Sequence, residues 1–107
     1  MTGFDEREKS FERKFQQDQE LAFKVKARRN KLLGLWAAEK LGLSGEAAER
    51  HAREVLHSDL QRPGDDDIVA KVASDFAKAG VAIDATRVRV ELQRWAAEAK
   101  KQLGVTT

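Results

Sequence analysis

Residues 32–42 read Leu-Leu-Gly-Leu-Trp-Ala-Ala-Glu-Lys-Leu-Gly and contain the longest apolar run of the chain. With the residues before them they form one apolar stripe along a helix predicted from about Glu20 to Leu41. The stripe consists of Leu21, Val25, Leu32, Leu35 and Trp36. Leu33, Ala37 and Ala38 widen it, so we expect this half of the helix to be the most buried part of the protein, with Trp36 in the core. Gly42 suits the position just after a helix C-terminus.

Three further helices are predicted from the same apolar spacing and from residues that begin and end helices. They span residues 44–60, 65–80 and 84–104. Ser44 and Asp84 are good N-cap residues, and Ile83 and Val88 have the spacing of a hydrophobic staple. The short loops favour antiparallel neighbours. The predicted fold is therefore all-α, a four-helix bundle over residues 20–107.

Composition narrows the class of protein. The chain of 107 residues is one domain with a modest core, and 36% charged residues, no tyrosine and few β-branched residues favour helices over a sheet. The absence of cysteine excludes a disulfide scaffold, thiolate metal sites and cysteine nucleophiles, and it suits a reducing cytoplasm. The charged N-terminus predicts no signal peptide, and the apolar run is far too short for membrane insertion.

Residues 1–19 differ in character from the bundle and form a predicted N-terminal arm. From Phe4 to Glu20 the only apolar side chains are Phe4, Phe11 and Phe15, set among ten charged residues. On a helix these phenylalanines fall within roughly 40° of one another, a stripe too narrow to build a core. Burying three phenylalanines contributes ~5–9 kcal/mol at most, whereas ordering the backbone costs on the order of 1–2 kcal/mol per residue. We therefore predict a mobile, amphipathic arm that binds a partner's groove as a helix. The alternative is an N-terminal helix docked on its own domain.

Charge is unevenly distributed along the chain. Residues 1–20 carry a net charge of −2, residues 21–40 carry +5, and the whole chain carries +2. Five cations lie within eight residues of the basic segment: Lys24, Lys26, Arg28, Arg29 and Lys31. They form a candidate second docking surface for an acidic protein, although solubility and ion pairs within the helix explain them equally well. The pattern is not the uniformly basic one of a nucleic-acid binder.

No catalytic, metal or cofactor site is predicted. Adjacent carboxylates diverge by about 100° on a helix, so Asp65, Asp66 and Asp67 suit capping of a helix start rather than a metal ion. His57-Ser58-Asp59 has the residue types of a hydrolase triad, but contiguous helical positions point apart. His51 and His57 lie on different faces, and we expect His51 to pack at the edge of the core. We therefore expect a protein that is not an enzyme.

Three blocks of sequence carry a resemblance to a known family. They are Phe11-Glu12-Arg13-Lys14-Phe15, then ARRNKLLGLWAAEKLGL over residues 27–43, then Gly64-Asp65-Asp66-Asp67. In order and spacing the chain resembles the ζ inhibitor subunit of α-proteobacterial F-type ATP synthases from residue 4 to about residue 80. The middle block is long enough to be specific.

The resemblance implies a four-helix bundle whose mobile arm inserts between catalytic subunits of the ATPase head, near the rotor, and blocks ATP hydrolysis. The role is analogous to that of the mitochondrial inhibitor protein, although the folds are unrelated. Carried onto this chain, it implies that Phe4, Phe11 and Phe15 are anchors of the arm. It also implies that four cations pair with acidic groups of the head: Arg7, Lys9, Arg13 and Lys14.

The expected partners are therefore the catalytic and rotor subunits of the ATP synthase head, and the expected location is cytoplasmic, peripheral to the inner membrane. Two other functions stay open at this stage. One is a helical interaction or adaptor module with little inhibitory potency. The other is a nucleic-acid binder, or a weak nucleotide binder, that uses the Lys24–Lys31 segment.

Overall fold

A computed structural model describes the backbone of residues 2–60 and 64–104 and the side chains of residues 18–58 and 64–104. Within these residues the chain forms four helices and no strand. The helices are α1 (Thr2–Lys40), α2 (Gly45–Leu60), α3 (Asp66–Lys78) and α4 (Ala85–Gln102). The all-α fold and the order of its four helices are thus as predicted.

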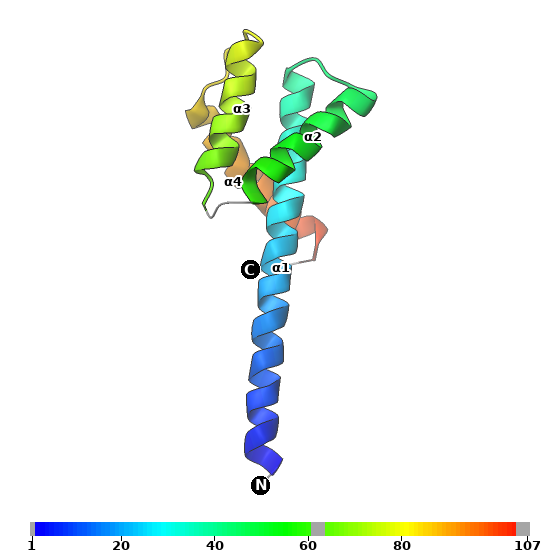
Figure 1. Cartoon of the computed structure of the whole chain (residues 1–107), viewed down its shortest axis with the longest axis vertical. Coiled ribbons are helices and arrows are strands. Elements are labelled where there is room, and N and C mark those ends of the chain that lie inside the picture. The colour runs from blue at the N-terminus through cyan, green and yellow to red at the C-terminus, as the bar shows by residue number, and fades with distance from the viewer. Residues whose placement is uncertain (1, 61–63, 105–107) are drawn as a thin grey trace.

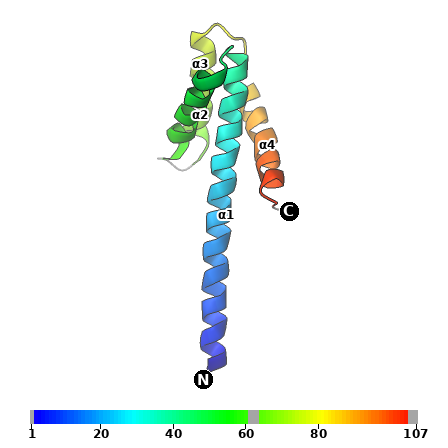
Figure 2. The same ribbon diagram turned by 90° about the vertical axis from the view of Figure 1, so that its right-hand side faces the viewer.

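The long helix α1 is the axis of the molecule. Its C-terminal half packs against α2 and α4, while α3 closes the bundle against α2 and α4 (Figure 1). Turned by 90°, the molecule shows α2 and α4 on opposite sides of α1, and the N-terminal half of α1 extends beyond all the other helices (Figure 2). The predicted first helix began at about Glu20; in the structure its backbone continues to Thr2.

The core lies around the C-terminal half of α1, as predicted. Leu33, Ala37 and Ala38 are fully buried, and Trp36 is 7% exposed. Trp36 meets Phe76 of α3 edge-on, with ring centroids 5.6 Å apart and an interplanar angle of 88°. This T-shaped contact joins α1 to α3 across the centre of the bundle, so Trp36 is a core residue.

Gly34 lets α1 and α2 approach closely in the same region. A Cβ atom built on Gly34 would lie 2.7 Å from Cα of Ala52 and 3.2 Å from Cβ of Val55. Real Cβ atoms essentially never approach another heavy atom to 2.7 Å, and 3.2 Å is already a tight contact. The glycine within the apolar run is therefore required by the packing of α2 on α1.

The helix ends follow the predicted signals in most places. Gly42 has φ +78°, its N–H donates to Glu39 O, and the N–H of Leu43 donates to Ala38 O, which is a Schellman motif. Asp84 caps α4 by accepting a hydrogen bond from the Arg87 N–H at 3.0 Å. Val88 belongs to the buried core cluster and the partly buried Ile83 packs against it, in agreement with the predicted staple.

Candidate partner-binding surface

The arm is the predicted partner-binding segment, and its backbone forms the first half of α1. Its predicted contact residues lie outside the part of the chain whose side chains are described. These residues are Phe4, Arg7, Lys9, Phe11, Arg13, Lys14 and Phe15. Their role as anchors and ion-pairing groups stays a prediction.

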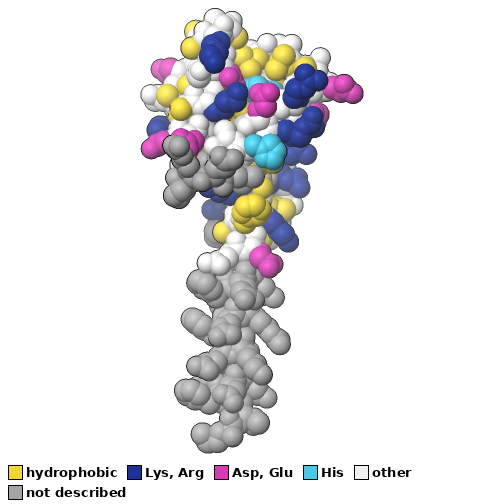
Figure 3. Space-filling model, in the orientation of Figure 1, with side chains coloured by type: hydrophobic (Ala, Val, Ile, Leu, Met, Phe, Trp, Pro, Cys, Tyr) yellow, Lys and Arg dark blue, Asp and Glu magenta, His cyan; other side chains and the backbone are white. Residues whose placement is uncertain are grey.

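The described part of α1 next to the arm exposes apolar side chains. Leu21 is 38% exposed and Phe23 is 58% exposed. Leu21 belongs to the predicted apolar stripe, but the stripe runs past the end of the bundle here, so less of the residue is covered. Figure 3 shows hydrophobic and basic side chains side by side where α1 leaves the bundle.

The structure divides the five cations of the basic segment into two sets. Lys24, Arg28 and Lys31 are exposed and occupy positions i, i+4 and i+7, which lie on one strip of a helix. Lys26 and Arg29 are half-buried on the opposite side. From the sequence alone the five cations form one group spread around the helix, because their burial depends on how the helices pack.

Arg29 joins α1 to the start of α3. Its Nη2 donates to Asp65 Oδ1 at 3.0 Å, and its Nε donates to Oδ1 of the fully buried Asn30 at 2.9 Å. Asp65 holds the N-cap position of α3, yet its side chain accepts no hydrogen bond from the helix N–H groups. The prediction that Asp65 caps α3 through its side chain is therefore wrong, because its carboxylate accepts from Arg29 instead.

Asp66 and Asp67 lie in the first turn of α3, where carboxylates stabilise the helix dipole. Asp66 Oδ1 also accepts a hydrogen bond from Arg89 Nη2 of α4 at 3.0 Å. The three aspartates thus stabilise the start of α3 and connect it to α1 and α4. Among the residues with described side chains, no group of three or more histidine or acidic side chains could hold a metal ion.

A groove lies between the strip of exposed cations and the neighbouring helices. Its floor and walls are apolar and come from α1, α2 and the end of α4: Phe23, Ala27, Leu56 and Leu103. Lys24, Arg28 and Lys31 form its rim, and no acidic residue lines it. Nη1 of Arg28 donates to Oε1 of Gln102 at 3.0 Å, which ties the rim to α4. We call these seven lining residues the basic groove.

A second groove, on the other side of α1, has a mixed character. Leu21, Ala22 and Val25 of α1 face Ala96 and Lys100 of α4 across it. Asp18, Lys26 and Arg29 complete its lining, so opposite charges meet there. Nearby on α4, Trp95 is half-buried with Arg94 over its ring at 5.2 Å.

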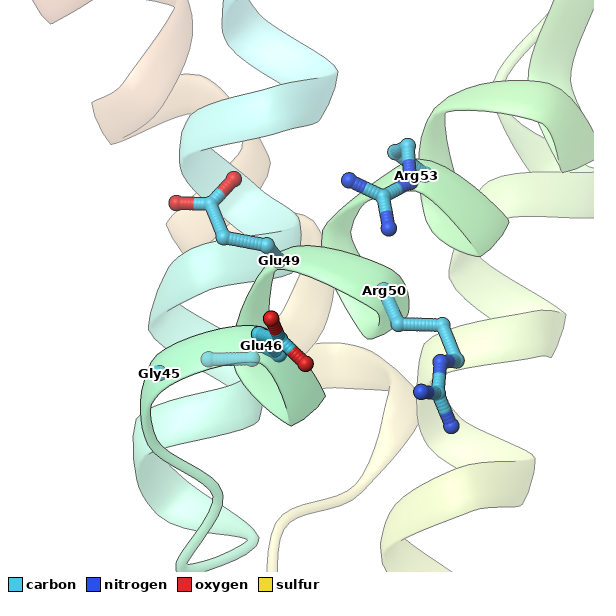
Figure 4. A pocket seen from close by; sticks show the side chains of 6 residues that line it. Gly45, Glu46, Glu49, Arg50 and Arg53 are labelled. Atoms are coloured by element: carbon cyan, nitrogen blue, oxygen red, sulfur yellow. The ribbon is translucent and has the colours of Figure 1, made fainter.

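A polar cleft on the outer side of α2 is lined mainly by charged residues: Gly45, Glu46, Ala48, Glu49, Arg50 and Arg53. In Figure 4 the guanidinium groups of Arg50 and Arg53 point in different directions, and two carboxylates accompany them. An arrangement with equal numbers of acids and bases does not select an anion. We assign no ligand to this cleft.

Buried polar groups in the bundle serve packing. His51 is 7% exposed and bridges α1 and α3, as expected for a residue at the edge of the core. Glu91 is buried on α4 and forms an ion pair with Arg87 Nη2 at 3.1 Å. The burial of Glu91 was not predicted from the sequence, because an acid at the edge of an apolar helical stripe is ordinarily exposed.

The geometry defines a class of protein: a small helical bundle that extends one long helix beyond its core. No helix in the described residues is long and apolar enough to cross a membrane. The family model "ATPase inhibitor subunit zeta" matches residues 1–102, so the chain belongs to this family. Membership supports a role as an ATP synthase inhibitor, a protein that associates with that enzyme, and agrees with a non-enzymatic function.

A solved structure supports the fold independently. A protein determined by solution NMR is 42% identical to the chain, with a TM-score of 0.67, and the match covers 76% of this chain and 92% of that one. No curated protein matches the chain.

Proposed function

We propose that the protein binds the catalytic head of the F-type ATP synthase and inhibits ATP hydrolysis through residues 1–19, which insert as a helix between catalytic subunits next to the rotor. Phe4, Phe11 and Phe15 are the anchors of this helix. Four cations pair with acidic groups of the head: Arg7, Lys9, Arg13 and Lys14. The protein acts without chemistry of its own, from the cytoplasmic side of the inner membrane.

One observation carries the proposal: the match to the inhibitor family extends over residues 1–102 and so includes the arm. The course of α1 agrees with it. The helix leaves the bundle as a single element, so a partner that binds its N-terminal half leaves the core packed.

An ATPase assay on the purified head tests the proposal. We expect the full chain to suppress hydrolysis and a variant without residues 1–17 to lose this effect at an almost unchanged melting temperature. If the variant inhibits as well as the full chain, the arm is not the inhibitory element. If the full chain binds the head without inhibiting it, the protein is an adaptor instead.

Amide exchange tests the mobility of the arm in the free protein. We expect residues 4–16 to exchange faster than residues 32–38, because the three phenylalanines have no core to join until the partner is bound. Equal protection in both segments would favour an arm docked or ordered before binding.

A further inference from the structure

We propose that the basic groove is a second contact site for the ATP synthase head and binds an acidic segment that carries a large apolar side chain. This inference rests on the proposed function, because it names a further surface through which the inhibitor holds the same partner.

The chemistry of the lining selects this kind of occupant. The floor offers Ala27, Leu56 and Leu103, while Phe23 forms an exposed apolar wall. Its volume of ≈ 340 Å³ is enough for one large side chain, and binding there would cover Phe23. An apolar side chain in this position would remove Phe23 from water, the largest exposed apolar side chain among the described residues of α1.

The charge of the rim indicates which residues flank the partner's apolar side chain. Lys24, Arg28 and Lys31 line one strip of the rim, and the lining contains no carboxylate to neutralise them. A partner with carboxylates on both sides of its apolar residue would pair with this strip. The segment of residues 21–40 has a net charge of +5, so approach of an acidic surface is also favoured at long range.

The place of the groove along α1 fits a contact at the entrance of the arm's binding site. A helix rises ~1.5 Å per residue, so Phe23 lies about 30 Å along α1 from Thr2. When the arm is inserted, the groove stands directly behind the inserted part. The arm and the groove therefore contact the same partner, the arm inside its binding site and the groove at the entrance. The second contact raises the affinity for that partner.

The test compares two triple charge reversals in the full chain. One changes the rim: Lys24→Glu, Arg28→Glu and Lys31→Glu. The matched control makes the same change in net charge with exposed cations near the other end of the bundle: Lys40→Glu, Arg50→Glu and Lys78→Glu. The readout is the concentration that half-inhibits the purified head, measured at low and high salt.

We expect the rim variant to require at least about tenfold more protein for half-inhibition, and the control variant less than about threefold. The inhibition by the wild type should weaken with salt, and the rim variant should show a smaller dependence, because only the four arm cations still pair with the head. Phe23→Ser removes the apolar wall at an exposed position and should weaken inhibition without lowering the melting temperature. A photo-crosslinker in place of Phe23 should attach to a subunit of the purified head.

Three outcomes would overturn the proposal. The first is equal inhibition by the wild type and the rim variant, which would exclude the groove as a contact site and leave the proposed function of the arm intact. The second is a wild-type dimer in sedimentation that the rim variant disperses, which assigns the groove to a second copy. The third is a photo-crosslinker at position 23 that attaches to no subunit of the head while the full chain still inhibits. If the wild type itself fails to inhibit, the proposed function fails instead.

Discussion

Nε2 of His51 on α2 lies 2.9 Å from Oδ2 of Asp75 on α3. The other ring nitrogen, Nδ1, lies 3.3 Å from the carbonyl oxygen of Gly34 on α1. One imidazole ring therefore connects three helices. Such a buried polar link is costly to break from one side only, because the remaining partner loses its hydrogen bond.

A double-mutant cycle tests this link. We expect His51→Ala and Asp75→Ala each to lower the free energy of unfolding by ~1–3 kcal/mol, and the double variant to lose less than the sum. Urea unfolding of the four proteins gives the coupling energy. Strict additivity would mean that the two side chains stabilise the bundle independently.

Gly34→Ala should destabilise the protein by ~1–3 kcal/mol, because the added methyl group meets the backbone of Ala52 at 2.7 Å. In an ordinary exposed helix position, the same change stabilises a protein through helix propensity. The sign of the change in melting temperature therefore shows whether the steric contact with Ala52 or the gain in helix propensity is larger. A higher melting temperature would show that α2 can move away from α1 at no cost.

Trp36→Ala should cost ~3–5 kcal/mol, because it removes a buried side chain and its edge-on contact with Phe76. Thermal unfolding measures the loss. A variant that kept its stability but lost binding to the ATPase head would show that Trp36 is a binding residue and does not stabilise the core.

Lys71 predicts a dependence of stability on alkaline pH. Burial alone would lower the pKa of Lys71, but its hydrogen bond to Asp75 and the charges of Asp75 and Glu54 outweigh this and raise its pKa. The ammonium group therefore contributes stability that is complete below ~10.4, the value for an unfolded lysine, and is lost as pH rises through the folded value. Lys71→Met should flatten the loss of stability between about pH 9 and pH 12. Lys78→Met, at an exposed position, is the control and should leave that slope nearly unchanged.

Phe11→Ala and Phe15→Ala should each cost at least ~2 kcal/mol of binding to the ATPase head, a loss of about thirtyfold in affinity. The melting temperature should change little, since these residues contribute little to the predicted core. Salt should weaken the wild-type interaction only in part, because apolar anchors are not screened. Variants that inhibit at wild-type potency would exclude these phenylalanines as anchors.

Much of the fold was predictable because its signals are local. The spacing of Val88 and Leu92 and the cap at Asp84 are written in consecutive residues, and the structure agrees with both. The contact of Arg29 with Asp65 joins residues 36 apart, and it overrides the capping expected of an aspartate at a helix start. A long-range ion pair of this kind leaves no periodic trace in a sequence.

The candidate site was predictable in part for the same reason. The basic segment is evident from composition, but its division into exposed Lys24, Arg28 and Lys31 and half-buried Lys26 and Arg29 depends on where α4 packs. The apolar floor of the groove combines Ala27, Leu56 and Leu103, which come from distant parts of the chain. Only the packed bundle brings them together.

The buried residues Leu33 and Trp36 lie on α1, as do the three rim cations of the basic groove. The packing of these two residues therefore fixes the direction in which the rim cations point. A single residue inserted after Lys31 would rotate the three rim cations by about 100° relative to the core, away from Leu56 and Leu103. Seven inserted residues, close to two complete turns, would nearly restore the direction but move the rim about 10 Å along the axis, past the end of α4. The number of residues between the core and the rim on α1 is therefore fixed by the packing of the bundle. Substitutions in this segment are better tolerated than insertions or deletions.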